Sequence, residues 1–116
     1  MRMSVLVAGL SLLAGPALAH AFLQHAAPGA GAELKAAPTQ ITLDFSEKLE
    51  PTFSGVSVTD AQGRDMEARP AKIADSNMTV TLKPLAQGRY HVAWHAVSTD
   101  SHRTEGSYSF EVETPE

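Results

Sequence analysis

Apolar and polar residues alternate in several short runs of this chain, and this period of two constrains the fold more than any other feature. The runs Ile41–Phe45, Gly55–Thr59 and Met78–Leu82 each alternate over five residues, as a strand does when one face is buried and the other is in water. The turn-forming cluster Asp60–Gly63 follows the second run. Pro84, which has no amide N–H for a strand ladder, follows the third. These runs predict short strands joined by turns.

Further strands are predicted at both ends of the chain, and no helical period persists. The segments concerned are Ala21–Ala26, Tyr90–Val97 and Tyr108–Val112. Between the first two, Ala32–Ala37 has room for a single helical turn, which Pro38 would end. Six or seven short strands in a chain of this length predict two antiparallel sheets packed face to face.

The first nineteen residues have the layout of a secretory signal peptide. Arg2 gives a basic start, Val5–Leu18 is apolar, and Ala17–Ala19 is a small-x-small cleavage pattern. An uncleaved membrane anchor and a merely apolar terminus are the alternatives, but the apolar run is too short to span a bilayer well. We therefore expect residues 1–19 to be removed and residues 20–116 to form the mature domain.

The absence of cysteine and the negative net charge limit the ligands and partners that this chain can bind. The whole chain has no cysteine, so an exported domain of this size folds without disulfides and has no thiolate metal site. Its formal net charge is −4. Proteins bind the phosphates of nucleic acids through positively charged surfaces, so this negative charge argues against nucleic-acid binding. We expect no nucleic-acid partner, no membrane insertion after cleavage, and a monomer.

Five histidines without any cysteine make metal binding the first functional hypothesis. Cleavage after Ala19 would give His20 a free amine, and that amine and its own ring Nδ1 can grip one metal ion. Asp100 and His102 lie two residues apart, roughly 6.5 Å along an extended chain and on the same side. Three nitrogens and one carboxylate oxygen suit a tetragonal Cu(II) ion, although Zn(II) can use the same donors in a tetrahedron.

Each of these residues also has an ordinary structural explanation. An exposed histidine can simply be a surface residue, and Asp100 can cap the backbone amides of a turn. His91 and His95 are four strand residues apart, roughly 13 Å, so we interpret them as surface or cross-strand packing residues. Glu47, at the end of a predicted strand, is either solvated or a carboxylate that orients a liganding imidazole.

At these residues the chain resembles the CopC-type periplasmic copper-binding proteins, the copper resistance protein C family. The resemblance begins at His20, includes Leu43–Glu47 and Phe53–Gly55, and covers nearly all of the mature chain. It is most specific in Gly88–His102, which contains Trp-x-x-Val-Ser-x-Asp-x-His, and in Gly106–Val112. The resemblance implies an all-β fold, a small Greek-key β-sandwich or barrel of cupredoxin-like or immunoglobulin-like type with about seven antiparallel strands.

The resemblance also implies a function and a site. Carried over position by position, one Cu(II) ion per mature chain would be held by His20, through its amine and ring, by Asp100 and by His102. Glu47 matches a family position close to that site. The implied role is copper homeostasis or resistance in the periplasm, as a carrier or buffer, with an inner-membrane copper transporter of the CopD type as a candidate partner.

One departure from the family concerns Cu(I). Some members carry a methionine-rich loop that binds Cu(I), but the corresponding region here, Gly63–Pro70, has the single methionine Met66. Met78 alternates with Val80 as a core residue would. Because a Cu(I) site usually needs several thioether ligands together, we expect the Cu(I) site to be absent.

Three classes of function remain open on the sequence. The leading hypothesis is a copper carrier or buffer that is not an enzyme, because four donors would leave little room for a substrate at the metal. The first alternative is an oxidative copper enzyme with an amino-terminal histidine brace, but aromatic residues make up only 6% of the chain and most fit the core. The second alternative is an interaction sandwich that binds no metal.

Overall fold

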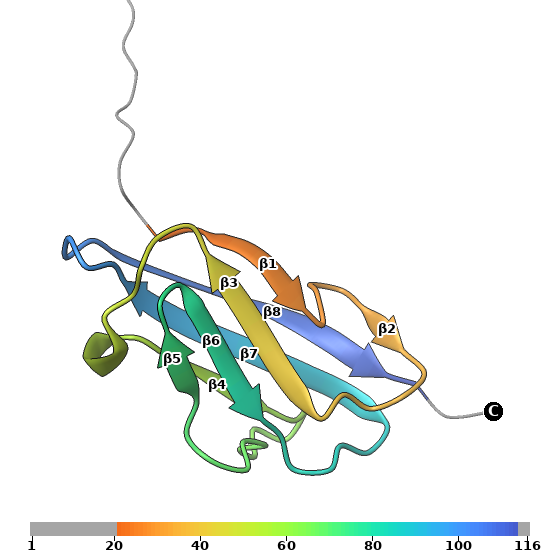
Figure 1. The fold of residues 1–116 in the computed structure, drawn as a ribbon. Coiled ribbons are helices and arrows are strands. Elements are labelled where there is room, and N and C mark those ends of the chain that lie inside the picture. Colours follow the sequence, from red (N-terminus) through yellow and green to blue (C-terminus); the bar gives the residue numbers. More distant parts are fainter. Residues whose placement is uncertain (1–20, 114–116) are drawn as a thin grey trace, which may run out of the picture.

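The computed structural model describes residues 21–113, and these residues form two four-stranded sheets that pack face to face (Figure 1). One sheet has the strand order β1-β3-β6-β5 and the other β2-β8-β7-β4. No helix in this part of the chain is long and apolar enough to cross a membrane. The predicted signal segment lies outside the described residues. The elements are β1 (Leu23–Ala27), β2 (Glu33–Leu34), β3 (Gln40–Phe45), the single 3-10 turn η1 (Pro51–Phe53), β4 (Gly55–Thr59), β5 (Lys72–Ala74), β6 (Asn77–Thr81), β7 (Gly88–Val97) and β8 (Arg103–Val112).

The alternating segments form the predicted strands, because their apolar residues face the opposite sheet. β4 has the predicted bounds, and β6 is shifted by one residue from the prediction. Met78 is fully buried, as its alternation indicated. The prediction of an all-β sandwich is thus confirmed. The central core residues are Ile41, Leu43, Phe45, Val58, Met78, Val80, Tyr90, Val92, Phe110 and Val112.

Residues 32–37 do not form the helical turn that their composition allowed. Instead β2 pairs with the end of β8, and this pairing is parallel, unlike the other strand pairs of the described chain. The amides of Glu111 and Glu113 donate to the carbonyls of Ala32 and Leu34 at 2.8 Å. A long-range partner therefore overrides the local preference, and the described residues contain eight strands where about seven antiparallel ones were expected.

β7 and β8 form the longest pairing, antiparallel from Gly88–Val112 to Val97–Arg103. β8 begins at Arg103, well before the predicted start at Tyr108. The first half of β8 does alternate in exposure, but its inward positions are Thr104 and Gly106 rather than large apolar residues. The hydrophobic pattern consequently gave no sign of this half of the strand.

Trp94 lies on the inner face of β7, at the edge of the core rather than at its centre. Its ring meets that of Phe45 edge to face, with centroids 5.1 Å apart and planes at 73°. A Cβ at Gly106 would lie only 2.7 Å from Cζ2 of Trp94. Glycine is therefore required at this position so that the indole can lie against the strand.

Gly106→Ala should lower the free energy of unfolding by about 1–3 kcal/mol, because the new methyl group must displace the indole ring. Denaturant unfolding followed by fluorescence measures this directly, since Trp94 is the one tryptophan of the chain. Ser107→Ala, at the exposed neighbouring position, is the matched control and should change stability by less than about 0.5 kcal/mol. Equal midpoints for wild type and Gly106→Ala would contradict the close packing.

Candidate metal centre

The loop Ser98–His102 connects β7 to β8 at one end of the sandwich, the same end at which the described chain enters β1 (Figure 1). The amide of Ser98 donates to the carbonyl of His102 at 2.9 Å, and the amide of Ser101 donates to the carbonyl of Ser98 at 2.8 Å. Ser101 has a φ of 77°, in the left-handed region that tight turns use. This turn brings Asp100 and His102 together.

Asp100 and His102 form a close, solvent-accessible pair. Nδ1 of His102 lies 3.2 Å from Oδ1 of Asp100, and the side chains are 51% and 45% exposed. The hydroxyl of Ser98, a residue only 1% exposed, donates to the same carboxylate oxygen. That hydroxyl is the main reason that the pKa of Asp100 lies below its usual range, and the backbone amide of His102 also lowers it.

The separation of these two donor atoms suits a shared metal ion. Donor atoms that each bind a metal at about 2.0–2.2 Å lie roughly 2.8–3.5 Å apart when they occupy neighbouring coordination positions, and the observed distance is 3.2 Å. Among residues 21–113, no group of three or more His, Cys, Asp or Glu side chains is placed to hold a metal. The described chain thus brings together two of the three predicted ligands, and the third, His20, lies outside the described residues.

The first described residues are held firmly at this end of the sandwich. Ala21 is fully buried, and its carbonyl accepts a hydrogen bond of 2.7 Å from the hydroxyl of Thr104. Phe22 donates its amide to Oγ of Ser46 and accepts from the amide of Ser46, both at 2.8 Å. The chain is therefore fixed at Ala21 to a residue only two positions beyond His102.

Glu47 lies between two contacts that hold this end together. Its neighbour Ser46 bonds to Phe22, and the carbonyl of its other neighbour, Lys48, accepts from the amide of Thr99 at 3.0 Å. Glu47 itself is exposed. It thus lies on the segment that connects the amino-terminal residues to the Ser98–His102 loop, and its predicted role beside the metal stays a prediction.

Comparison with known proteins decides the family. The model of the CopC domain matches residues 23–113. The chain belongs to the CopC domain family. Protein YobA from Escherichia coli (strain K12) is 39% identical over 116 residues, which cover 97% of this chain and 94% of the relative. Copper resistance protein C from Pseudomonas syringae pv. tomato is 36% identical over 110 residues, 87% of this chain and 86% of the relative.

A longer relative and two solved structures extend this comparison. Copper transport protein CutJ from Bacillus subtilis (strain 168) is 33% identical over 112 residues, 93% of this chain but only 21% of CutJ. The crystal structure of CopC from Methylosinus trichosporium OB3b matches with a TM-score of 0.76 and 33% identity, covering 84% of this chain and 97% of that one. PcoC, a methionine-rich copper resistance protein from Escherichia coli, matches with a TM-score of 0.71 and 35% identity, covering 82% and 100%. The family resemblance and the predicted sandwich are both confirmed.

The histidines of β7, His91 and His95, lie on the outer face of their sheet. His91 is exposed, and its Nδ1 is 3.2 Å from Oγ of Ser109 on the neighbouring strand. The ring of His95 covers Gly55, where a Cβ would lie 3.0 Å from the imidazole. Both residues are surface or cross-strand packing residues, as their spacing predicted.

Sequence reasoning did not single out Ser98, Thr104 or Ser46. A signal for Ser98 was available, because it continues the inward-facing series of β7, and a buried hydroxyl needs a hydrogen-bond partner. No comparable signal identified the contact of Thr104, because its partner Ala21 is 83 residues away in the chain. Long-range contacts of this kind, from a side chain to a distant carbonyl, leave no local pattern.

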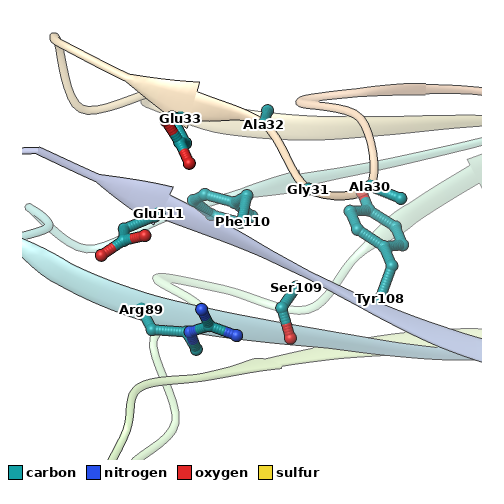
Figure 2. A pocket seen from close by; sticks show the side chains of 9 residues that line it. All are labelled: Ala30, Gly31, Ala32, Glu33, Arg89, Tyr108, Ser109, Phe110 and Glu111. Carbon is teal, nitrogen blue, oxygen red and sulfur yellow. The ribbon is translucent and has the colours of Figure 1, made fainter.

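A separate cleft of about 320 Å³ lies against the second half of β8. Figure 2 shows Arg89, Glu33 and Glu111 on one side of it and Tyr108 on the other. The hydroxyl of Tyr108 donates to the carbonyl of Pro28 at 2.9 Å, and burial raises its pKa to about 12. The cleft has no histidine in its lining and lies at the far end of β8 from the Ser98–His102 loop, so it is not part of the candidate metal centre.

Ser98→Ala should raise the pKa of Asp100 toward the ordinary value of about 3.9. In the wild-type chain, the interactions that lower this pKa stabilise the fold at pH values above the unfolded-state pKa. This stabilisation is lost as the pH falls through the folded-state pKa. An NMR titration of the Asp100 carboxyl carbon, in the metal-free protein, measures the shift. Ser107→Ala is the control and should leave it in place. The same titration midpoint in Ser98→Ala and wild type would rule out the hydroxyl as the cause.

Proposed function

We propose that the processed chain binds one Cu(II) ion through the amine and ring of His20, the carboxylate of Asp100 and the ring of His102, and that it works as a periplasmic copper carrier or buffer. The observation that carries this proposal is the exposed Asp100–His102 pair, with donor atoms 3.2 Å apart. Family membership supports copper as the metal, because relatives are named for copper resistance and copper transport.

The anchoring of Ala21 supports the part played by His20. Covalent geometry keeps the Cα of residue 20 about 3.8 Å from that of Ala21. The carbonyl of Ala21 is bonded to Thr104, two residues past His102. Removal of residues 1–19 would turn the nitrogen of His20 from an amide, which is a poor metal ligand, into an amine. Processing would thus complete the donor set.

The proposed donor set matches the chemistry of Cu(II). One amine, two imidazoles and a carboxylate are the nitrogen and oxygen ligands that a tetragonal Cu(II) ion prefers. Aspartate is ionised near neutral pH, and the pKa of Asp100 is lowered further by the Ser98 hydroxyl, so copper need not displace a proton from this proposed ligand. Glu47 is proposed as a nearby acceptor that orients a liganding ring, in keeping with its position between Ser46 and Lys48.

Cu(II) is proposed as the only oxidation state bound, and the chain is proposed not to be an enzyme. Met78 is fully buried in the core, and Met66 is half-buried against it, so neither resembles an exposed thioether cluster. Four donors from three residues leave little room for a substrate at the ion. A segment similar to this chain makes up 21% of the Bacillus subtilis protein named for copper transport, which supports a copper transporter of the CopD type as partner.

Acetylating the amine of His20 in the mature protein should weaken Cu(II) binding by at least about 100-fold, because a primary ligand should matter at least as much as the groups that orient ligands. Acetylation converts the amine into an amide nitrogen, which is a poor metal ligand, and leaves both imidazole rings and the carboxylate unchanged. Competition titration measures the affinity, and electron paramagnetic resonance should report one fewer nitrogen. Equal affinities for the free and the acetylated protein would contradict the proposed site.

His102→Ala and Asp100→Ala should each lower Cu(II) affinity while leaving the thermal midpoint within a few degrees of wild type, because both side chains are about half exposed. His91→Ala is the matched control, since it removes an exposed histidine from the outer face of the sheet, and it should bind Cu(II) as wild type does. Competition titration and calorimetry provide the two measurements. A loss in His91→Ala as large as that in His102→Ala would argue for scattered surface binding.

A further inference from the structure

The amino-terminal segment of the described chain is held by both sheets at once. The Ser46 bonds attach Phe22 to the residue that follows β3, in the first sheet. The Thr104 bond attaches Ala21 to β8, in the second sheet. Only the second attachment reaches the strand that begins directly after His102. The two attachments therefore have different effects. The bond to Thr104 sets the position of the segment relative to β7, β8 and the Ser98–His102 loop that joins them.

Thr104 is well suited to hold this position. It pairs with Ala96 on β7 and is half-buried at an inward-facing site where most strand residues would be apolar. A hydroxyl at such a site has to find a partner, and Oγ1 of Thr104 donates to the carbonyl of Ala21 at 2.7 Å. Because a β-branched side chain in a strand has restricted χ1 freedom, the direction of this donor is fixed by the strand.

From this geometry we infer that Thr104 is a positioning residue. Its hydroxyl holds the amino-terminal segment at a fixed position beside the loop that carries Asp100 and His102. The inference rests on the proposed function, in which residue 20 supplies two of the four donors. Thr104 is not itself a ligand. It fixes the backbone one residue away from the proposed ligand. The donors of the two distant segments are therefore held close together before the metal binds, and less conformational entropy is lost on binding.

The test is Thr104→Val in the mature protein, which keeps the β-branched shape and removes only the hydroxyl. Cu(II) affinity by competition titration should fall roughly fivefold, the effect of one lost hydrogen bond. The electron paramagnetic resonance spectrum should keep its nitrogen count, because the ligands are unchanged. In the metal-free protein, hydrogen exchange at the Phe22 amide should become faster. Thr104→Ser, which retains a hydroxyl, should restore affinity and exchange most of the way to wild type.

The matched control is Thr81→Val, the same substitution at a half-buried position of β6 that pairs with Gln40 at the start of β3. It should alter neither the affinity nor the exchange at Phe22. Wild-type exchange and affinity in Thr104→Val would overturn the inference, as would equal losses in Thr104→Val and Thr104→Ser. If the acetylated and free proteins bind Cu(II) alike, the proposed function fails, and faster exchange in metal-free Thr104→Val still shows separately that Thr104 holds the segment.

Discussion

The ten-residue pairing of β7 with β8 is the constraint on which the candidate metal centre depends. Its register ends at Val97–Arg103, which leaves five residues to make the connection. Because side chains in a strand alternate with a period of two, a slip of one residue would reverse the faces of one strand relative to the other, so that either Ser98 or Thr104 would turn toward solvent. One register therefore sets three features together: the buried hydroxyl under Asp100, the inward-facing Thr104, and the exposed tip of the loop.

At this end of the sandwich, hydrogen bonds tie the end of β7 to the segment that connects β3 to β4. The amide of Glu50 donates to the carbonyl of Val97 at 2.8 Å, and Oγ of Ser54 accepts from the amide of Val97 at 2.9 Å. These bonds satisfy backbone groups that would otherwise be buried without partners. Together with the bond from the amide of Thr99 to the carbonyl of Lys48, they attach the segment after β3 to the end of β7 and to the Ser98–His102 loop.

The parts of this fold that were predictable are those that a local pattern encodes. Alternation revealed β3, β4 and β6 because one face of each is apolar and buried. It missed β2, whose pairing depends on the distant end of β8, and the first half of β8, whose inward positions are Thr104 and Gly106. The closeness of Asp100 and His102 was predictable from their spacing of two residues, whereas their role as ligands stays a prediction. The role of His20 depends on a proteolytic event that strand patterns do not encode, and it stays a prediction.

The exposure of the Asp100–His102 pair bears on what kind of copper protein this chain can be. A buried ion would be held in a rigid shell and released slowly, whereas an ion on side chains that are 45% and 51% exposed can be reached by a second set of ligands. Exposed side chains ordinarily lose rotamer freedom when they bind, which weakens binding. Here the hydroxyl of Ser98 and the contact between Asp100 and His102 already restrict that freedom. The loop therefore combines an ordered pair of donor atoms with open access, which is the combination that the proposed role, a carrier of exchangeable copper, requires.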